Sequence, residues 1–94
     1  MKPPEVVITG VGMVSPIGIG RAAFREALYS GRSGVRRIEH YDSSTLPISF
    51  GGEVPDFDGK LYVRPRKSLK VMSREIQFGF AAADLAMSDA NLAA

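Results

Sequence analysis

The sequence contains no cysteine and only one histidine, His40. Without cysteine the chain cannot form a disulfide, bind a metal through thiolates or supply a cysteine nucleophile. No Ser-His-Asp pattern and no cluster of metal ligands surrounds His40. We therefore expect no metal ion and no cofactor, and we interpret His40 as a surface or packing residue.

Long apolar runs are also absent. No stretch approaches the ~20 residues that a membrane-spanning helix needs, and Met1–Pro4 leads directly into the chain without the regions of a secretory signal. The formal net charge of +2 is too small to indicate a nucleic-acid partner. We expect a cytoplasmic protein that binds neither membrane nor nucleic acid. A length of 94 residues suits one small domain or a part of a larger one.

The first feature present is a β-branched run followed by glycines. Val6–Thr9 is typical of a strand covered on both faces, as in a parallel α/β sheet. We expect Gly10 and Gly12 to end this strand and let the backbone turn tightly. A dinucleotide-binding loop needs a third glycine, where this chain has Ser15, and a helix directly after it. We therefore interpret these glycines as structural.

Two segments show the apolar spacing of helices. The first predicts a helix over Arg21–Ser30, with Gly31 placed to end it in the left-handed conformation. The second predicts a helix over Ile76–Met87, which has the strongest helical pattern in the chain. Ser73 is a suitable N-cap for this second helix, and Asn91 can terminate it.

Strand and turn signals lie between the two predicted helices. Ile48–Val54 alternates apolar with small or polar residues and predicts a strand with a glycine interruption. Val35–Leu46 shows no regular pattern, apart from an expected turn at Asp42–Ser44. A second turn is expected at Asp56–Gly59, directly after the strand.

A basic segment precedes the second helix. Between Gly59 and Arg74 there are six basic side chains and no acidic one: Lys60, Arg64, Arg66, Lys67, Lys70 and Arg74. Such a run is either a solvated face or a docking patch for an anionic partner. If the backbone there is helical, Lys67 and Lys70 project from one side, and Arg66 and Arg74 could flank them. The segment has a single aromatic residue, so base stacking with a nucleic acid is not favoured.

Four blocks of the sequence together resemble a known family. They are "VVITGVGMVSPIG", "FREALYSGRSGV", "FGGEVPDFD" and "RKSLKVMSREIQFGFAAADLAMSDANL". In order and spacing they look like the amino terminus of chain-elongating β-ketoacyl-[acyl-carrier-protein] synthases. The resemblance implies an α/β fold: the amino-terminal part of a thiolase-like α/β/α/β/α architecture, with a few strands and two main helices. Residues 1–94 would form the first part of the N-terminal domain of such a synthase, and the glycines after the first strand would be structural.

The resemblance also implies that the catalytic residues are elsewhere. Family members use a cysteine nucleophile at a strand-to-helix elbow, two histidines and a lysine. None of these positions falls within the matched blocks, and His40, in "IEHYD", is not one of the histidines. The chain would be an inactive fragment of a homodimeric enzyme that condenses an acyl thioester with malonyl-carrier protein. Apolar surface at Val6–Thr9 and Ile76–Met87 would then be exposed, and the isolated chain would unfold with low cooperativity or aggregate.

The resemblance implies that part of this chain binds acyl carrier protein. In similar synthases a basic patch before the long helix binds acyl carrier protein, and the matching positions here are Arg66, Lys67 and Lys70, with Arg74 as a nearby candidate. Several relatives have another basic residue where this chain has Val71, which suggests a weaker or rearranged patch. Three alternatives remain: a polyketide ketosynthase, its chain-length partner subunit, and a carrier-protein-binding module without chemistry.

Overall fold

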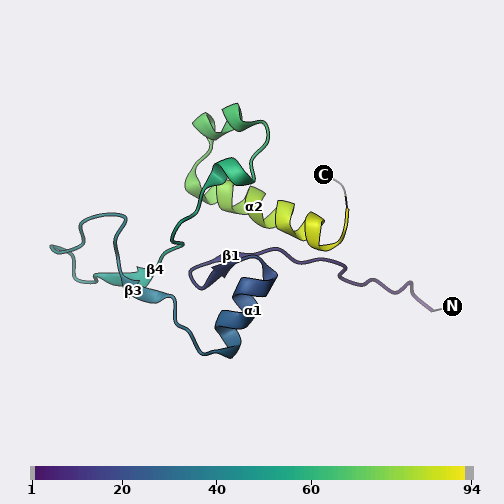
Figure 1. Ribbon diagram of the computed structural model, residues 1–94, viewed down its shortest axis with the longest axis horizontal. Helices are drawn as coiled ribbons and strands as arrows, with labels where there is room; N and C mark the ends of the chain where they lie inside the picture. The colour runs from purple at the N-terminus through teal and green to yellow at the C-terminus, as the bar shows by residue number, and fades with distance from the viewer. Residues whose placement is uncertain (1, 93–94) are drawn as a thin grey trace.

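The computed structural model describes residues 2–92, and these form two α-helices, two 3-10 helices and two small antiparallel sheets (Figure 1). In chain order the elements are β1 (Val14–Ser15), β2 (Gly18–Ile19), α1 (Arg21–Tyr29), β3 (Val35–Arg37), β4 (Phe50–Gly52), η1 (Gly59–Leu61), η2 (Arg66–Val71) and α2 (Arg74–Asp89). The expected combination of a few strands with two main helices is confirmed.

Helix α1 ends in the left-handed turn that the sequence predicts. Gly31 has a φ of 75°, and its N–H donates to the carbonyl of Leu28 at 3.2 Å. The N–H of Arg32 donates to the carbonyl of Ala27 at 3.0 Å. These two bonds form a Schellman motif, which satisfies carbonyls that have no partner inside the helix.

Helix α2 has both of its predicted ends. The Ser73 side chain accepts the N–H of Ile76 at 3.3 Å, which satisfies one of the free donors at the helix start. At the other end Asn91 has a φ of 59°, and its N–H donates to the carbonyl of Ser88 at 3.1 Å. The helix is longer than the predicted Ile76–Met87 at both ends because the caps, and not the apolar pattern, determine where it begins and ends.

The sheets are smaller than predicted, and three strands, β1, β2 and β3, were not predicted. β1 and β2 form a hairpin, whereas β3 pairs with β4 with Arg36 opposite Gly51. The prediction of an irregular Val35–Leu46 is therefore wrong for β3, and the strand predicted over Ile48–Val54 is reduced to β4. β3 has three residues, two of them arginines, so it shows no alternation of apolar and polar residues. It is a strand because it pairs with β4, which is distant in sequence.

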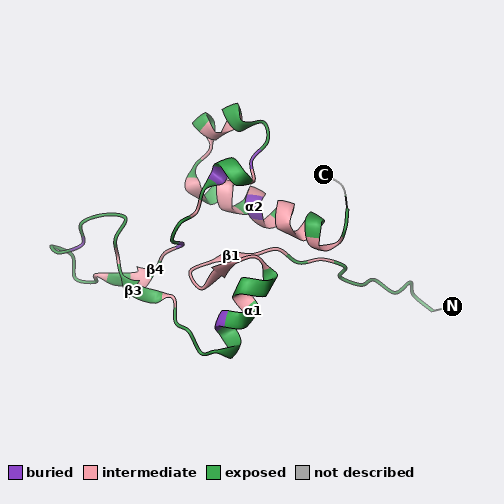
Figure 2. Ribbon diagram, in the orientation of Figure 1, coloured by how far each residue is buried: buried purple, intermediate pink, exposed green. Residues whose placement is uncertain are grey.

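The prediction of a strand at Val6–Thr9 is wrong for the described residues. This segment is extended but pairs with no other strand of residues 2–92. A strand requires a neighbour for its backbone N–H and C=O groups, and the other strands of this chain pair among themselves. Val6 is 91% exposed and Ile8 is 84% exposed (Figure 2), so the expected apolar surface at this segment is confirmed.

Few side chains are buried among the described residues. The buried apolar ones are Ala27, Val54, Val63 and Ala81. The radius of gyration is 16.6 Å, whereas a compact domain of this length would have about 12 Å. The chain therefore forms an open arrangement around α2, which packs against β1 and η1, and does not enclose a core of ordinary size.

The two glycines of the first block allow the backbone to approach α2 closely. A Cβ on Gly12 would overlap the carbonyl oxygen of Ala82 and lie 2.5 Å from the nitrogen of Ala86. A Cβ on Gly10 would overlap the carbonyl oxygen of the same Ala86. Neither glycine has a positive φ, so the expected tight turn at these residues is wrong. Their structural role is confirmed, but it is close packing.

We expect Gly12→Ala to destabilise the fold by about 2 kcal/mol or more, because the added methyl group cannot fit against the α2 backbone. Gly79→Ala is the matched control: it lies inside α2, and its Cβ would meet nothing within 4 Å. This control should stabilise the helix by about 0.5–1 kcal/mol. Urea denaturation followed by circular dichroism measures both, and equal effects of the two substitutions would contradict the packing role.

Candidate functional site

The 3-10 helix η2 brings the predicted docking cations onto one surface. Its turns are closed by hydrogen bonds from Ser68 N–H to the carbonyl of Pro65 at 3.0 Å and from Met72 N–H to the carbonyl of Leu69 at 3.2 Å. A 3-10 helix has three residues per turn, so side chains three apart lie directly above one another. The exposed side chains of Lys67 and Lys70 therefore share one side of η2, as the spacing predicts.

The basic side chains around η2 differ in how they are engaged. Arg66, Lys67 and Lys70 are exposed and form no ion pair with a carboxylate of residues 2–92. Arg64, just before η2, pairs with Asp84 of α2 at 2.5 Å. Of the exposed cations in the basic segment that have no carboxylate partner within residues 2–92, three lie on η2 and one, Lys60, lies on η1.

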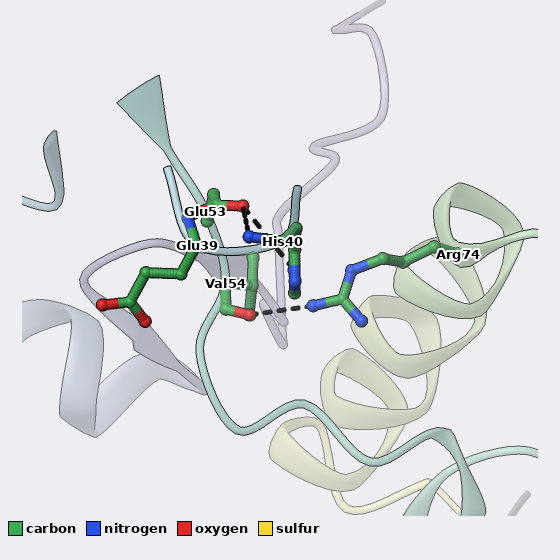
Figure 3. Close-up of polar contacts among 5 residues, drawn as sticks. All are labelled: Glu39, His40, Glu53, Val54 and Arg74. Carbon is green, nitrogen blue, oxygen red and sulfur yellow. Dashed lines mark hydrogen bonds and ion pairs between the residues drawn. The ribbon is translucent and has the colours of Figure 1, made fainter. Parts of the chain in front are cut away.

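Arg74, the fourth predicted docking residue, is half-buried in intramolecular contacts. Its guanidinium carbon lies 4.9 Å from the ring centre of Phe78 and 5.7 Å from that of Phe57. Its Nη2 donates to the backbone carbonyl of Val54 at 2.8 Å (Figure 3). The structure thus brings Arg66, Lys67 and Lys70 together on η2. It places Arg74 at the start of α2, half-buried among intramolecular contacts.

The rings beside Arg74 form an aromatic cluster of Phe57, Tyr62 and Phe78. Phe57 stacks on Tyr62 with ring centres 5.8 Å apart, and it meets Phe78 edge-on at 4.8 Å. Tyr62 is half-buried in this cluster, so its ring is not presented as a platform for a nucleic-acid base. The sequence analysis did not identify this cluster. The four-residue spacing of Arg74 and Phe78 on one helix was the available signal.

Hydrogen bonds of Glu53, called the Glu53 tie below, join the segments that follow β3 and β4. Glu53 accepts the N–H of Glu39 at 2.7 Å and the N–H of His40 at 3.1 Å through its two carboxylate oxygens (Figure 3). The hydrogen bond from Glu39 is the main reason that the pKa of Glu53 lies below its usual value, and the hydrogen bond from the His40 N–H lowers it further. His40 Nε2 is 4.0 Å from Glu53, and the His40 side chain is 50% exposed, which agrees with the interpretation of a surface residue.

The start of α1 carries a carboxylate where a dinucleotide site would need a phosphate. Asp89 lies beside Gly20, the N-cap of α1, in a shallow hollow. Its Oδ1 pairs with Arg21 at 3.2 Å, and its Oδ2 accepts the N–H of Val11 at 3.0 Å. A fixed negative charge at this helix start opposes the binding of an anion.

The described residues show neither a metal centre nor a membrane span. Within residues 2–92, no three His, Cys, Asp or Glu side chains converge as metal ligands would. In the same part of the chain, no helix has both the length and the apolar character that crossing a bilayer requires.

Comparison with known proteins places the chain in a family. Residues 4–94 match the β-ketoacyl synthase, N-terminal domain. The chain belongs to the β-ketoacyl synthase family. The resemblance found in the four sequence blocks is thereby confirmed, over nearly the whole chain.

The curated relatives include 3-oxoacyl-[acyl-carrier-protein] synthases and a polyketide synthase subunit. The chain is 39% identical over 92 residues to 3-oxoacyl-[acyl-carrier-protein] synthase 2 of Vibrio harveyi, covering 98% of this chain and 22% of that protein. It is 37% identical over 90 residues to the tetracenomycin polyketide synthase ketoacyl synthase beta subunit of Streptomyces glaucescens, covering 96% of this chain and 22% of that protein. This β-ketoacyl synthase chain therefore spans about a fifth of the length of these relatives.

A solved structure confirms the fold class. The chain superimposes on the ishigamide ketosynthase/chain length factor with a TM-score of 0.81 and 36% sequence identity, covering 93% of this chain and 21% of that one. The arrangement of α1, α2 and the small sheets is thus that of the corresponding part of a ketosynthase. The β-ketoacyl synthase chain has a thiolase-like fold, as the sequence blocks predict.

We expect the Glu53 tie to stabilise the β-ketoacyl synthase chain above about pH 4.5 and to be lost in acid. The pKa of the folded state lies below the usual 4.5, so the stabilisation is present above the unfolded pKa and disappears as the pH falls through the folded one. Urea midpoints of the wild type and Glu53→Gln, measured from pH 7 to pH 3, should differ most at neutral pH and converge at the acid end.

The matched control for this tie is Glu26→Gln. Glu26 is exposed on α1 and forms no side-chain hydrogen bond or ion pair with residues 2–92. The control should leave the urea midpoint at neutral pH unchanged. A constant difference between the wild type and Glu53→Gln over the whole pH range would contradict the role of the Glu53 charge.

Proposed function

We propose that this chain is the opening part of an elongating 3-oxoacyl-[acyl-carrier-protein] synthase and supplies part of its carrier-protein docking surface. The complete enzyme would join an acyl thioester to malonyl-carrier protein. A carbon–carbon bond forms, carbon dioxide leaves, and the acyl–sulfur bond breaks, which frees the thiol that carried the acyl group. Its expected partners are the acyl and malonyl forms of acyl carrier protein, and we expect it to be a homodimer in the cytoplasm. It would need no metal and no cofactor of its own.

The observation that carries the proposal is the exposed cationic side of η2. Arg66, Lys67 and Lys70 project from one short helix and have no carboxylate partner in residues 2–92. Acyl carrier protein presents an acidic helix to similar synthases, which is the complementary charge. Charges at the rim of an interface mainly raise the encounter rate and fix the orientation of the partner, and salt weakens them.

The chemistry itself would come from outside these residues. The chain has no cysteine to carry the acyl group, and a condensing reaction needs an activated thiolate together with groups that stabilise the developing negative charge. His40 is tied to Glu53 through both its backbone and its ring, and this position gives it no nucleophile to activate. The 94 residues alone are therefore expected to be inactive.

A polyketide ketosynthase or its chain-length subunit is the second candidate. The relative from Streptomyces glaucescens and the matched ketosynthase/chain length factor favour it. Condensing synthases and the chain-length subunit share the region covered by this chain and differ at the nucleophile elbow. The encoding gene can be read beyond codon 94 to decide: a cysteine at the elbow indicates a condensing enzyme, and another residue indicates the partner subunit.

We expect Lys67→Glu/Lys70→Glu to weaken binding of acyl carrier protein on the order of tenfold at low salt, because two attractive rim charges become repulsive. Isothermal titration calorimetry of the complete enzyme with the carrier protein, repeated at increasing salt, measures the effect. In the complete enzyme the same substitutions should slow turnover of carrier-protein substrates and spare small thioester surrogates.

Arg25→Glu is the matched control for charge reversal. Arg25 is exposed on α1, where its guanidinium lies over the ring of Tyr29, and Figure 1 shows α1 apart from the segment of residues 66–71. This control should leave the affinity within about twofold of the wild type. Equal losses for both variants, or equal losses with carrier-protein and surrogate substrates, would refute a docking role for η2.

A further inference from the structure

We propose that Arg74 is a positioning residue for the docking surface: it fixes the direction in which η2 presents its cations and does not itself contact the carrier protein. The inference rests on the proposed docking function of η2. It assigns to Arg74 a different role from that of the exposed lysines, although all belong to the same basic segment.

Arg74 joins two parts of the chain that are distant in sequence: the stretch between β4 and η1, and α2. Its guanidinium donates to Val54, which follows β4, and lies over the ring of Phe57, which precedes η1. It also lies over Phe78, one turn further along α2. Figure 3 shows the side chain reaching from α2 to the Val54 carbonyl. One side chain therefore connects the stretch between β4 and η1 to α2.

These contacts lie at the carboxyl end of η2. Only Met72 and Ser73 separate Val71, the last residue of η2, from Arg74. Gln77 of α2 donates to the carbonyl of Met72 at 3.3 Å, so this connection is held against the helix as well. A 3-10 helix has poor hydrogen-bond geometry, and its direction therefore depends on the anchors at its ends.

The other end of η2 is also attached to α2. Arg64 pairs with Asp84, and Val63 is 1% exposed. The two ends of η2 are thus anchored on the same helix, while Lys67 and Lys70 between them are free. Loss of one anchor would let the pair of lysines change direction without changing their charge.

An arginine suits this position better than a lysine. The guanidinium is planar, so it can stack on aromatic faces and donate to a carbonyl at the same time. A lysine keeps the positive charge but offers no flat surface. Arg74→Lys therefore separates positioning from charge, because it removes the stacked geometry and preserves the net charge of the basic segment.

The test is calorimetric binding of acyl carrier protein to the Arg74→Lys and Arg74→Gln variants of the complete enzyme. We expect both variants to bind about fivefold more weakly than the wild type. The slope of affinity against salt should remain that of the wild type, because the cations of η2 are still present. A residue that only stabilises the fold would lower the urea midpoint but leave the affinity of the folded molecules unchanged.

Arg21→Lys is the matched control. Arg21 pairs with Asp89 at the opposite end of α2, so this substitution alters an arginine contact on the same helix without touching η2. It should bind as the wild type does. Phe57→Leu provides a second, independent variant: it removes one ring beneath the guanidinium, keeps Arg74, and should also weaken binding about fivefold. If Arg74→Lys does not fold, Phe57→Leu decides the question.

The outcomes separate the inference from the proposed function. Wild-type affinity for Arg74→Lys together with weak binding by Arg74→Gln would make Arg74 a docking charge and overturn the inference. Wild-type affinity for both Arg74 variants and Phe57→Leu, with Lys67→Glu/Lys70→Glu still defective, would overturn it and leave the docking function intact. No loss in Lys67→Glu/Lys70→Glu would instead refute docking at η2.

Discussion

The structure depends on the close contact of other chain segments with α2. The amino-terminal backbone lies against this helix where Gly10 and Gly12 leave no side chain between them, and Asp89 at the far end of α2 holds Val11 and Arg21. These contacts position the β1–β2 hairpin and the start of α1. The same helix anchors the basic segment at its other end. Since α2 packs against β1 and η1 and holds Arg64 and Met72 on either side of η2, its position determines where the cations of η2 lie.

The small number of buried side chains is consistent with a chain that corresponds to about a fifth of its relatives' length. α2 and its attached segments leave Val6–Thr9 extended and exposed, and the radius of gyration exceeds that of a compact domain. A sheet strand covered on both faces needs neighbours that residues 2–92 do not supply. The family's thiolase-like fold provides the context in which such a strand would be paired and covered.

The basic segment contains two kinds of side chain, which have different roles in the proposed function. Lys67 and Lys70 are solvated charges on a short helix, suited to attracting an acidic partner at a distance. Arg64 and Arg74 have the same charge, but an ion pair and an aromatic stack hold them within the fold. Sequence spacing alone groups these four side chains as one basic patch. The sequence shows which residues are charged, but it does not show which groups each charge contacts.

The sequence by itself determined the local features: both helices with their caps, the left-handed Gly31 and Asn91, and the family. These depend on residues within about one helical turn of each other, or on ordered motifs. Tertiary structure decided the pairing of β3 with β4, the unpaired state of Val6–Thr9 and the half-buried position of Arg74. Each of these depends on groups far apart in the chain, and backbone pairing or aromatic stacking between such groups leaves no periodic signal in the sequence.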